Sequence, residues 1–149
     1  KEFFDYIIFA DVLEHLQNQK HALDCAFKLL NAGGSIWISV PNIAHNSVII
    51  DLMLDKFEYR DAGLLDKTHI KFFTKSSLKE LIQSSNMLVT KQFNLINAVG
   101  NTEFNNNYDS VPKPVSDFLK RKQNGEVYQF VWELKKNDKD TEHNNPGIQ

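Results

Sequence analysis

The chain has 149 residues, of which 42% are hydrophobic and 24% charged, with a formal net charge of −2. This length is typical of one domain, and the near-neutral charge gives no reason to expect a nucleic-acid partner. The apolar runs are far shorter than the roughly 20 residues of a membrane span, and the single cysteine, Cys25, excludes an internal disulfide, so we expect a cytoplasmic protein without a transmembrane helix.

An apolar, β-branched run opens the chain at Phe4–Phe9 and predicts a strand that is buried on both faces. Asp11, Glu14 and His15 follow it at the spacing i, i+3, i+4, which places them on one face if a helix begins here. Polar groups just beyond the carboxyl end of such a strand lie where open α/β sheets bind ligands. Asp11 and Glu14 also have capping-box spacing, so capping a helix is their alternative role.

A second strand follows after a helix. An apolar stripe at helical spacing predicts a helix within Gln19–Leu30, and Gly33-Gly34 is expected to end it. The run Ser35–Val40 predicts a second buried strand. Strand, helix and strand within about forty residues indicate a βαβ unit with a right-handed crossover.

The middle of the chain predicts four further segments: a short helix from Asn46 or Ser47 to Leu54, a loop over Phe57–Thr68, a helix over Lys75–Ser85 and a strand over Met87–Leu95. Thr74 has the side chain of an N-cap for the second of these helices. Asn86 is expected to adopt the left-handed turn at its end.

The last third combines a long polar segment with two regular elements. Asn97–Lys113 has five asparagines and predicts a loop or lid, followed by a short helix over Pro114–Lys122 and a fourth strand over Val127–Leu134. From Lys135 the chain has almost nothing to bury. We therefore expect the folded domain to occupy residues 1–134 and residues 135–149 to be a disordered tail.

Three stretches carry motifs that are specific in combination: FDYIIFADVLEHL at 4–16, GGSIWISVPN at 33–42 and GLLDKTHIKFFTKSSLKEL at 63–81. Together they resemble the second half of a class I S-adenosylmethionine-dependent methyltransferase. The resemblance covers roughly residues 4–95. It implies an α/β, Rossmann-like doubly wound sheet of seven strands with an antiparallel last strand, of which this chain would supply strands four to seven.

Two parts of that family's cofactor site have no counterpart in the sequence. These are the glycine-rich loop after the first strand and the acidic residue after the second. The chain also has no initiator Met and begins almost directly in a buried-type strand. We therefore expect a domain truncated at its amino end, whose N-terminal strands lie upstream and whose isolated fragment is inactive.

The resemblance implies S-adenosylmethionine as the cofactor, with Ala10, Asp11 and Val12 beside it. Glu14 and His15 would then lie one turn further on, towards the methyl acceptor. Methyl transfer to oxygen or nitrogen needs an aligned acceptor and a base, and histidine titrates near neutrality. The alternative is that Glu14 only caps a helix and His15 only packs beside it.

Three residues further along the chain are candidates for the acceptor site. His69 is expected to take part in catalysis, or else to pin its loop through a backbone carbonyl. Asn42 and Phe72 are expected to contact the acceptor, although Asn42 could equally serve a turn and Phe72 the core. His21 and His45 are interpreted as ordinary surface or loop residues.

Asp11, Glu14, His15 and His69 also suggest a metal site, since two carboxylates and two imidazoles can hold Mg²⁺, Mn²⁺ or Zn²⁺. Some methyltransferases that resemble this chain use E-x-x-E-H and a later His for a divalent ion. This sequence has Asp in place of the first Glu, and many relatives with D-x-L-E-H bind no metal. We therefore expect no metal and keep the four-residue site as the alternative.

The predicted function is methyl transfer to a small-molecule or sugar acceptor, by analogy with glycan, lipid and quinone pathways that such enzymes serve. The competing hypothesis is a non-catalytic half-domain. An exposed Phe4–Phe9 edge could add to the sheet of a partner chain, or pair two copies of this chain as a homodimer.

Overall fold

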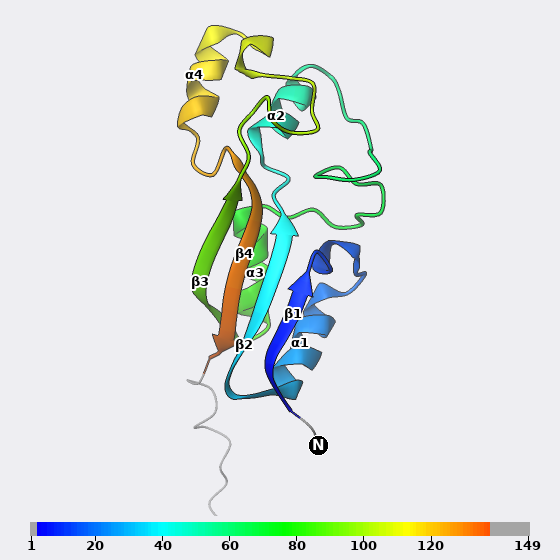
Figure 1. Cartoon of the computed structure of the whole chain (residues 1–149), viewed down its shortest axis with the longest axis vertical. Coiled ribbons are helices and arrows are strands. Elements are labelled where there is room, and N and C mark those ends of the chain that lie inside the picture. The colour runs from blue at the N-terminus through cyan, green and yellow to red at the C-terminus, as the bar shows by residue number, and fades with distance from the viewer. Residues whose placement is uncertain (1–2, 138–149) are drawn as a thin grey trace, which may run out of the picture.

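The computed structural model describes residues 3–137. Its centre is a four-stranded sheet with the spatial order β1 (Phe4–Ala10), β2 (Leu30–Pro41), β4 (Val127–Lys136), β3 (Met87–Ile96). β1 and β2 are parallel, whereas β4 lies between β2 and β3 and is antiparallel to both (Figure 1). The α/β class and the antiparallel last strand are therefore as predicted.

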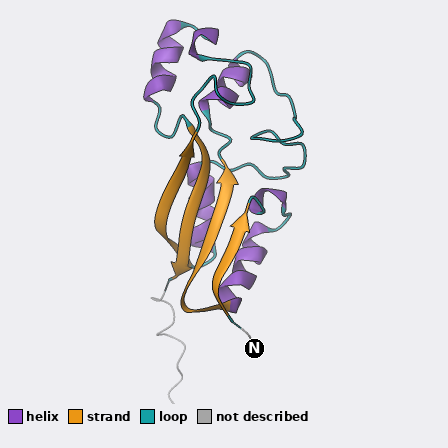
Figure 2. Cartoon of the chain, viewed as in Figure 1, coloured by secondary structure: helices purple, strands orange, loops and turns teal. Residues whose placement is uncertain are grey.

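Two helices cover one face of the sheet, α1 (Gln19–Leu29) and α3 (Lys75–Ser84) (Figure 2). Their apolar stripes meet the sheet in the main core, whose fully buried members include Leu23, Ile36, Leu78 and Trp132. α2 (Asn46–Met53) and α4 (Lys113–Arg121) lie beyond the end of the sheet at which β1 and β2 finish. That end also carries the long loops, so the polar residues after β1 and β2 lie beneath them.

The start of α1 differs from the prediction. The Asn18 side chain, not Asp11, caps α1 by accepting a hydrogen bond from the His21 backbone N–H at 2.9 Å. Asp11 instead has a positive φ of 52°, and only a 3₁₀ turn, Leu13–His15, follows it. The predicted helix face shared by Asp11, Glu14 and His15 is therefore wrong, because the chain turns sharply at Asp11 before any helix begins.

The paired glycines also have a different place. α1 ends at Leu29, and Gly33-Gly34 lie inside β2 rather than at the helix end. Between Leu30 and Ser35 β2 has extra residues relative to β1, and Gly33, at φ +80°, lies in this irregular stretch. Glycine is used here because such an irregularity requires the left-handed region.

β1 is not buried on both faces. Tyr6 and Ile8 are 69% and 68% exposed, and by the alternation of a strand they lie on the face opposite Ile7 and Phe9, which pack against the main core. β1 has β2 as its one neighbour among residues 3–137, so it is an edge strand there. The apolar composition that predicted two-sided burial is present, but the described part of the chain covers only one face.

The remaining elements agree with the predictions to within a few residues. The helices α2, α3 and α4, the strand β3 and the left-handed Asn86 all form, and a capping box at Thr74 begins α3. β4 extends past the predicted end, because Lys135 and Lys136 pair with Leu88 and Met87. The disordered tail is therefore wrong for these two residues, and residues 138–149 lie outside the described part. His45, interpreted as a surface or loop residue, is fully buried as the N-cap of α2.

Candidate active site

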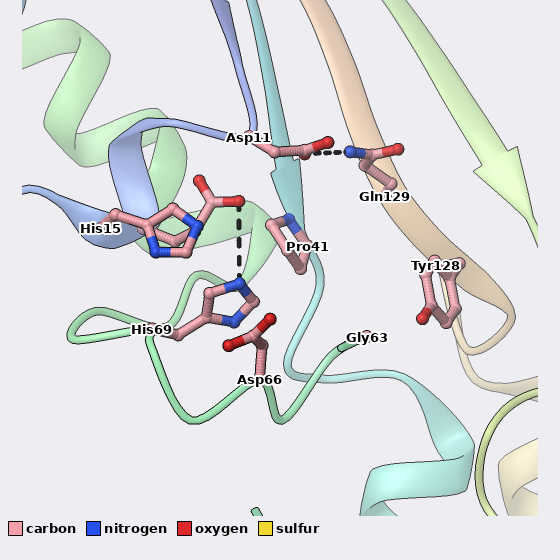
Figure 3. Close-up of a pocket in the computed structure, with 9 residues that line it drawn as sticks. Asp11, His15, Pro41, Gly63, Asp66, His69, Tyr128 and Gln129 are labelled. Atoms are coloured by element: carbon pink, nitrogen blue, oxygen red, sulfur yellow. Dashed lines mark hydrogen bonds and ion pairs between the residues drawn. The ribbon is translucent and has the colours of Figure 1, made fainter. Parts of the chain in front are cut away.

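A cavity of about 280 Å³ lies at the carboxyl ends of β1 and β2. Figure 3 shows how its lining converges from four parts of the chain. The lining residues are Asp11, Glu14 and His15 after β1, Pro41 at the end of β2, Gly63, Asp66 and His69 from the loop before α3, and Tyr128 and Gln129 from β4. All three predicted catalytic residues, Glu14, His15 and His69, therefore line one cavity.

Glu14 is a buried carboxylate without a hydrogen-bond partner. Its side chain is 1% exposed, and neither carboxylate oxygen has a partner among residues 3–137. The nearest basic group is His69, whose Nε2 lies 4.0 Å from Oε1, which is beyond hydrogen-bond distance. Burial raises the pKa of the Glu14 carboxyl above its ordinary value, and the Asp11 charge acts in the same direction.

His69 lies against both Glu14 and His15. Its side chain is 6% exposed, and its ring centroid lies 4.9 Å from that of His15 in an edge-to-face arrangement. Burial, followed by the charge of His15, lowers the pKa of His69. The imidazole of His69 is therefore neutral at pH 7. The Glu14 carbonyl accepts hydrogen bonds from the Ile70 and Lys71 N–H groups at 2.9 and 3.0 Å, which joins the 3₁₀ turn to the segment after His69.

The hydrogen bonds of His15 define its tautomer. Its Nδ1 lies 3.1 Å from the Thr68 carbonyl oxygen and 3.2 Å from the Thr68 hydroxyl. That hydroxyl donates its own hydrogen to Asp66 Oδ1 at 2.7 Å, so it can only accept from His15. Nδ1 must therefore carry the proton. In the neutral ring this leaves Nε2 with a lone pair, as a general base requires.

Asp66 supports this arrangement. One carboxylate oxygen accepts from both the backbone N–H and the hydroxyl of Thr68, each at 2.7 Å. These two hydrogen bonds lower the pKa of Asp66, so it is ionised at neutral pH. Asp66 therefore fixes the orientation of Thr68, and Thr68 fixes that of His15.

The three residues expected to contact the cofactor are exposed at the end of β1. Asp11 Oδ1 accepts hydrogen bonds from the Ser39 hydroxyl, at 3.1 Å, and from the Gln129 amide. Both of these bonds are made by Oδ1, and the residue is exposed. Ala10 and Val12, on either side, are exposed as well.

The four-residue metal site does not assemble as a whole. Glu14, His15 and His69 each bring a ligand atom to within 4.8 Å of the other two, but Asp11 is not part of this group. Asp11 is instead tied to β2 and β4 through Ser39 and Gln129. Its departure from the group follows from the sharp turn of the chain at its positive φ.

Asn42 and Phe72 do not line the cavity. Asn42 is buried, where its amide donates to the Val127 carbonyl at 2.8 Å and its side-chain oxygen accepts from the Ala44 N–H at 3.0 Å. Phe72 is half-buried in a small second core and meets the His69 ring edge to face, with centroids 6.1 Å apart. Both have structural partners, and acceptor contact for either residue stays a prediction.

Sequence reasoning missed the contributions of Tyr128 and Gln129. They lie on β4, more than a hundred residues after β1, and reach the cavity because β4 inserts beside β2. The Tyr128 hydroxyl donates to the Glu103 carboxylate at 3.0 Å. Burial, with the Glu103 charge, raises the pKa of Tyr128, so it remains protonated. No local signal marks these residues, since only the strand order brings them here.

Residues 1–92 match the sequence model of the family described as "Methyltransferase domain". The chain belongs to this family. Its curated relatives include two proteins named ubiquinone biosynthesis O-methyltransferase, mitochondrial. The one from Rattus norvegicus is 28% identical over 91 residues, which are 59% of this chain and 26% of that protein; the one from Mus musculus is 26% identical, over 59% and 24%. The matched part of this chain thus spans about a quarter of the length of these two relatives.

Solved structures agree on the fold. A methyltransferase from Thermotoga maritima superposes with a TM-score of 0.57 at 15% identity, over 91% of this chain and 56% of that one. One from Archaeoglobus fulgidus gives 0.54 at 18% identity, over 91% and 60%. Both are titled S-adenosylmethionine-dependent, and at these identities they establish a Rossmann-like class I methyltransferase fold for this domain.

No helix within residues 3–137 is long and apolar enough to cross a membrane. The cytoplasmic location stays a prediction. Both curated relatives have "mitochondrial" in their names, which describes those proteins and not this chain.

Proposed function

We propose that the chain forms the acceptor side of an S-adenosylmethionine-dependent methyltransferase that acts on a hydroxyl group of a small molecule. The observation that carries the proposal is the tautomer of His15. Thr68 and Asp66 hold its Nδ1 in the protonated form and leave the Nε2 lone pair for a substrate proton. Family membership supports the reaction class, and the name O-methyltransferase of the curated relatives favours oxygen as the acceptor atom.

The exposed end of β1 suits the cofactor. S-adenosylmethionine supplies a methyl group on a sulfonium when it is bound. The exposed Asp11 carboxylate can bind a hydrogen-bond donor of that molecule or face its positive charge. Ala10 and Val12 would flank it, as the resemblance implies.

His15 then has the role of general base. Its Nε2 would accept the proton of the acceptor hydroxyl, and S-adenosylmethionine, when bound, would supply the methyl group that the oxygen receives. The imidazolium that results is stabilised by Glu14, whose charge acts on His15 across the cavity. His69, neutral and in contact with both side chains, keeps water away from them and fixes their positions.

The charges of the cavity disfavour an anionic acceptor. Asp11, Glu14 and Asp66 line it, and no lysine or arginine from residues 3–137 does. An acceptor with a carboxylate or phosphate beside its reactive hydroxyl would meet repulsion. A neutral phenol, alcohol or sugar hydroxyl fits this lining, which keeps both small-molecule and glycan acceptors in the proposal.

The test uses the native protein that contains this chain. Formation of S-adenosylhomocysteine is measured by mass spectrometry with a panel of neutral phenols, neutral sugars and their carboxylated analogues. Turnover with at least one neutral hydroxyl compound, and none with its carboxylated analogue, would support the proposal. No methyl transfer to any hydroxyl compound, despite S-adenosylmethionine binding, would refute it.

A divalent ion is the second candidate for this cavity. Glu14 has two buried oxygens without partners, and His15 and His69 lie close enough to share an ion with it. Asp11 would not complete the set, so we favour the metal-free mechanism. Activity that is lost with a chelator and restored by Mg²⁺, Mn²⁺ or Zn²⁺ would support the metal instead.

The edge of β1 supports a separate proposal about partners. Phe4, Tyr6 and Ile8 are exposed along a strand that has one neighbour within residues 3–137. Such an edge can pair two copies of the chain as a homodimer. Light scattering on the chain and on an Ile8→Lys variant tests it, because a dimer that is formed through this edge should dissociate in the variant. The non-catalytic half-domain hypothesis is not favoured by the family match.

A further inference from the structure

We infer that Glu103, in the 97–113 segment, is a positioning residue that holds the loop before α3 and thereby fixes His69 beside Glu14. The contacts of this carboxylate are in the described structure, whereas its value for catalysis rests on the function proposed above. Glu103 does not line the cavity, so it does not itself touch the acceptor.

The Glu103 carboxylate joins two parts of the active-site region. Oε1 accepts a hydrogen bond from the Leu64 backbone N–H at 2.7 Å. The Tyr128 hydroxyl donates to the same carboxylate, 3.1 Å from Oε1 and 3.0 Å from Oε2. One side chain therefore connects the loop before α3 to β4, and it does so next to Gly63 and Tyr128, which both line the cavity.

Gly63 shows how closely the carboxylate approaches the loop. A Cβ atom at this position would lie only 2.2 Å from Glu103 Oε1. The residue also has a φ of +93°, which favours glycine. The backbone at Gly63 therefore packs directly on the carboxylate.

From Leu64 the constraint can pass to His69 through short backbone links. Asp66 N–H donates to the Gly63 carbonyl at 3.2 Å, and His69 N–H donates to the Asp66 carbonyl at 3.0 Å. The Leu64 and Leu65 side chains are fully buried in the second core, so this stretch has little freedom to move sideways. A loop that is fixed at Leu64 is therefore fixed at His69 as well.

The polar 97–113 segment, which the sequence predicts only as a loop or lid, is anchored to the rest of the domain and positions Glu103. It is anchored on α2 through Asn106, whose amide donates to the Ser47 carbonyl and to Asp51. Phe104 enters the second core, where its ring also lies 5.1 Å below the Arg60 guanidinium carbon. With Phe104 and Asn106 anchored, Glu103 has a fixed place from which to hold the loop.

The first test uses two variants to distinguish the length of the Glu103 side chain from its charge. Glu103→Asp keeps the charge but is too short to contact both Leu64 and Tyr128. Glu103→Gln loses the charge but keeps an oxygen at the same distance. Asp109→Ala, which removes an exposed carboxylate of the same segment, is the matched control.

Amide hydrogen exchange by NMR is the readout. We expect Glu103→Asp to accelerate exchange about tenfold or more at Leu64, and also at Ile70 and Lys71, whose N–H groups donate to the Glu14 carbonyl. The His69 titration should shift upwards, because a looser loop removes the burial that lowers its pKa. Glu103→Gln and Asp109→Ala should leave both unchanged.

The inference would be overturned if Glu103→Asp accelerated exchange at Leu64 but left exchange at Ile70 and Lys71 and the His69 titration unchanged. Glu103 would then stabilise only its own hydrogen bond to Leu64 and not the position of His69. Equal effects of Glu103→Gln and Glu103→Asp would overturn it too, since a side chain of full length would then hold the loop no better than one that is too short. These measurements need no enzyme activity. Failure of the proposed function, seen as no methyl transfer, is therefore distinguishable from failure of this inference.

Discussion

Glu14 and His69 face each other at 4.0 Å from two different motifs, with side chains that are 1% and 6% exposed. Each environment disfavours the charged form, since burial raises the pKa of Glu14 and lowers that of His69. A buried pair of titratable groups in which the carboxylate has no hydrogen-bond partner among residues 3–137 costs stability and is typical of functional sites. The predictions below use this cost and the geometry around it.

Replacement of Glu14 by Gln should stabilise the protein at pH 7. The carboxyl has a folded-state pKa above its unfolded value, so its contribution to stability is complete below pH 4.5 and is lost as the pH rises through the folded pKa. An amide avoids this loss, and the expected gain is about 1 kcal/mol at pH 7.

Urea unfolding at pH 7 and at pH 4 measures this gain, which should shrink at the lower pH. Glu80→Gln, an exposed change on α3, is the control and should have no effect. A lower stability of Glu14→Gln at pH 7 would mean that the carboxylate has a stabilising partner, contrary to the structure.

His45 should make the protein sensitive to mild acid. It is fully buried, its Nε2 donates to the Asn97 carbonyl at 2.8 Å, and its Nδ1 accepts from the Ser47 N–H at 3.1 Å. Burial lowers its pKa. Its contribution is therefore complete above the unfolded pKa of about 6.5 and is lost as the pH falls through 6.5 towards the folded pKa, by up to about 1.4 kcal/mol per pH unit.

Thermal unfolding between pH 7.5 and 5.5 tests this slope. Asn can keep the cap at α2 without titrating, so His45→Asn should flatten the dependence, although it lowers stability at pH 7.5 through the lost bond to Asn97. Burial lowers the pKa of His69 as well, so some dependence of stability on pH should remain in His45→Asn. His21→Asn, an exposed change on α1, should leave the slope intact; an unchanged slope in His45→Asn would assign the acid sensitivity elsewhere.

His15→Ala should lower the turnover number of the native protein by about 10²–10⁴-fold, the range that is typical for loss of a general base. Its affinity for S-adenosylmethionine, measured by calorimetry, should change little, because the cofactor contacts are proposed for residues 10–12. Thr68→Val is the graded control. It removes the hydroxyl but keeps the carbonyl acceptor of His15, so its loss should be smaller. Full turnover of His15→Ala would remove His15 from the mechanism.

The local sequence was sufficient for most elements and for the end of the sheet at which the candidate catalytic residues lie. Alternating or apolar runs and caps such as Thr74 predict most helices and strands, and the polar residues after β1 indicate one end of the sheet as the site. Contacts between distant segments were not predictable. Tyr128 reaches the cavity only through the strand order, and His45 is buried against two distant parts of the chain, at Asn97 and Tyr128.

The exposure of β1 also could not be predicted from the local sequence. Residue type at Tyr6 and Ile8 predicts what a strand can bury, but burial depends on which elements lie beside it. Asp11 is a second case. Its capping-box spacing with Glu14 was sound, yet the left-handed turn at Asp11 turns its side chain towards Ser39 and Gln129 instead. Conformation at one residue decided which of two reasonable roles it has.

Alanine substitutions at Gly63 and Gly100 can distinguish the cost of backbone strain from the cost of a steric clash. Gly63 and Gly100 have nearly equal φ values, +93° and +94°, but only Gly63 has a neighbour where a Cβ would lie, the Glu103 carboxylate. Gly100→Ala should therefore cost only the strain of the left-handed conformation, about 1 kcal/mol. Gly63→Ala should cost at least about 1 kcal/mol more, because the carboxylate must move and release Leu64 or Tyr128.

Urea unfolding of both variants measures this difference. The double variant Gly63→Ala/Glu103→Ala removes the clash together with the carboxylate, so the Gly63→Ala cost measured in that background should fall towards that of Gly100→Ala. Equal costs for the two single variants would mean that the carboxylate yields freely at Gly63. In that case Glu103 could not hold the loop that carries His69, and the approach of the two segments would be a contact without consequence for the site.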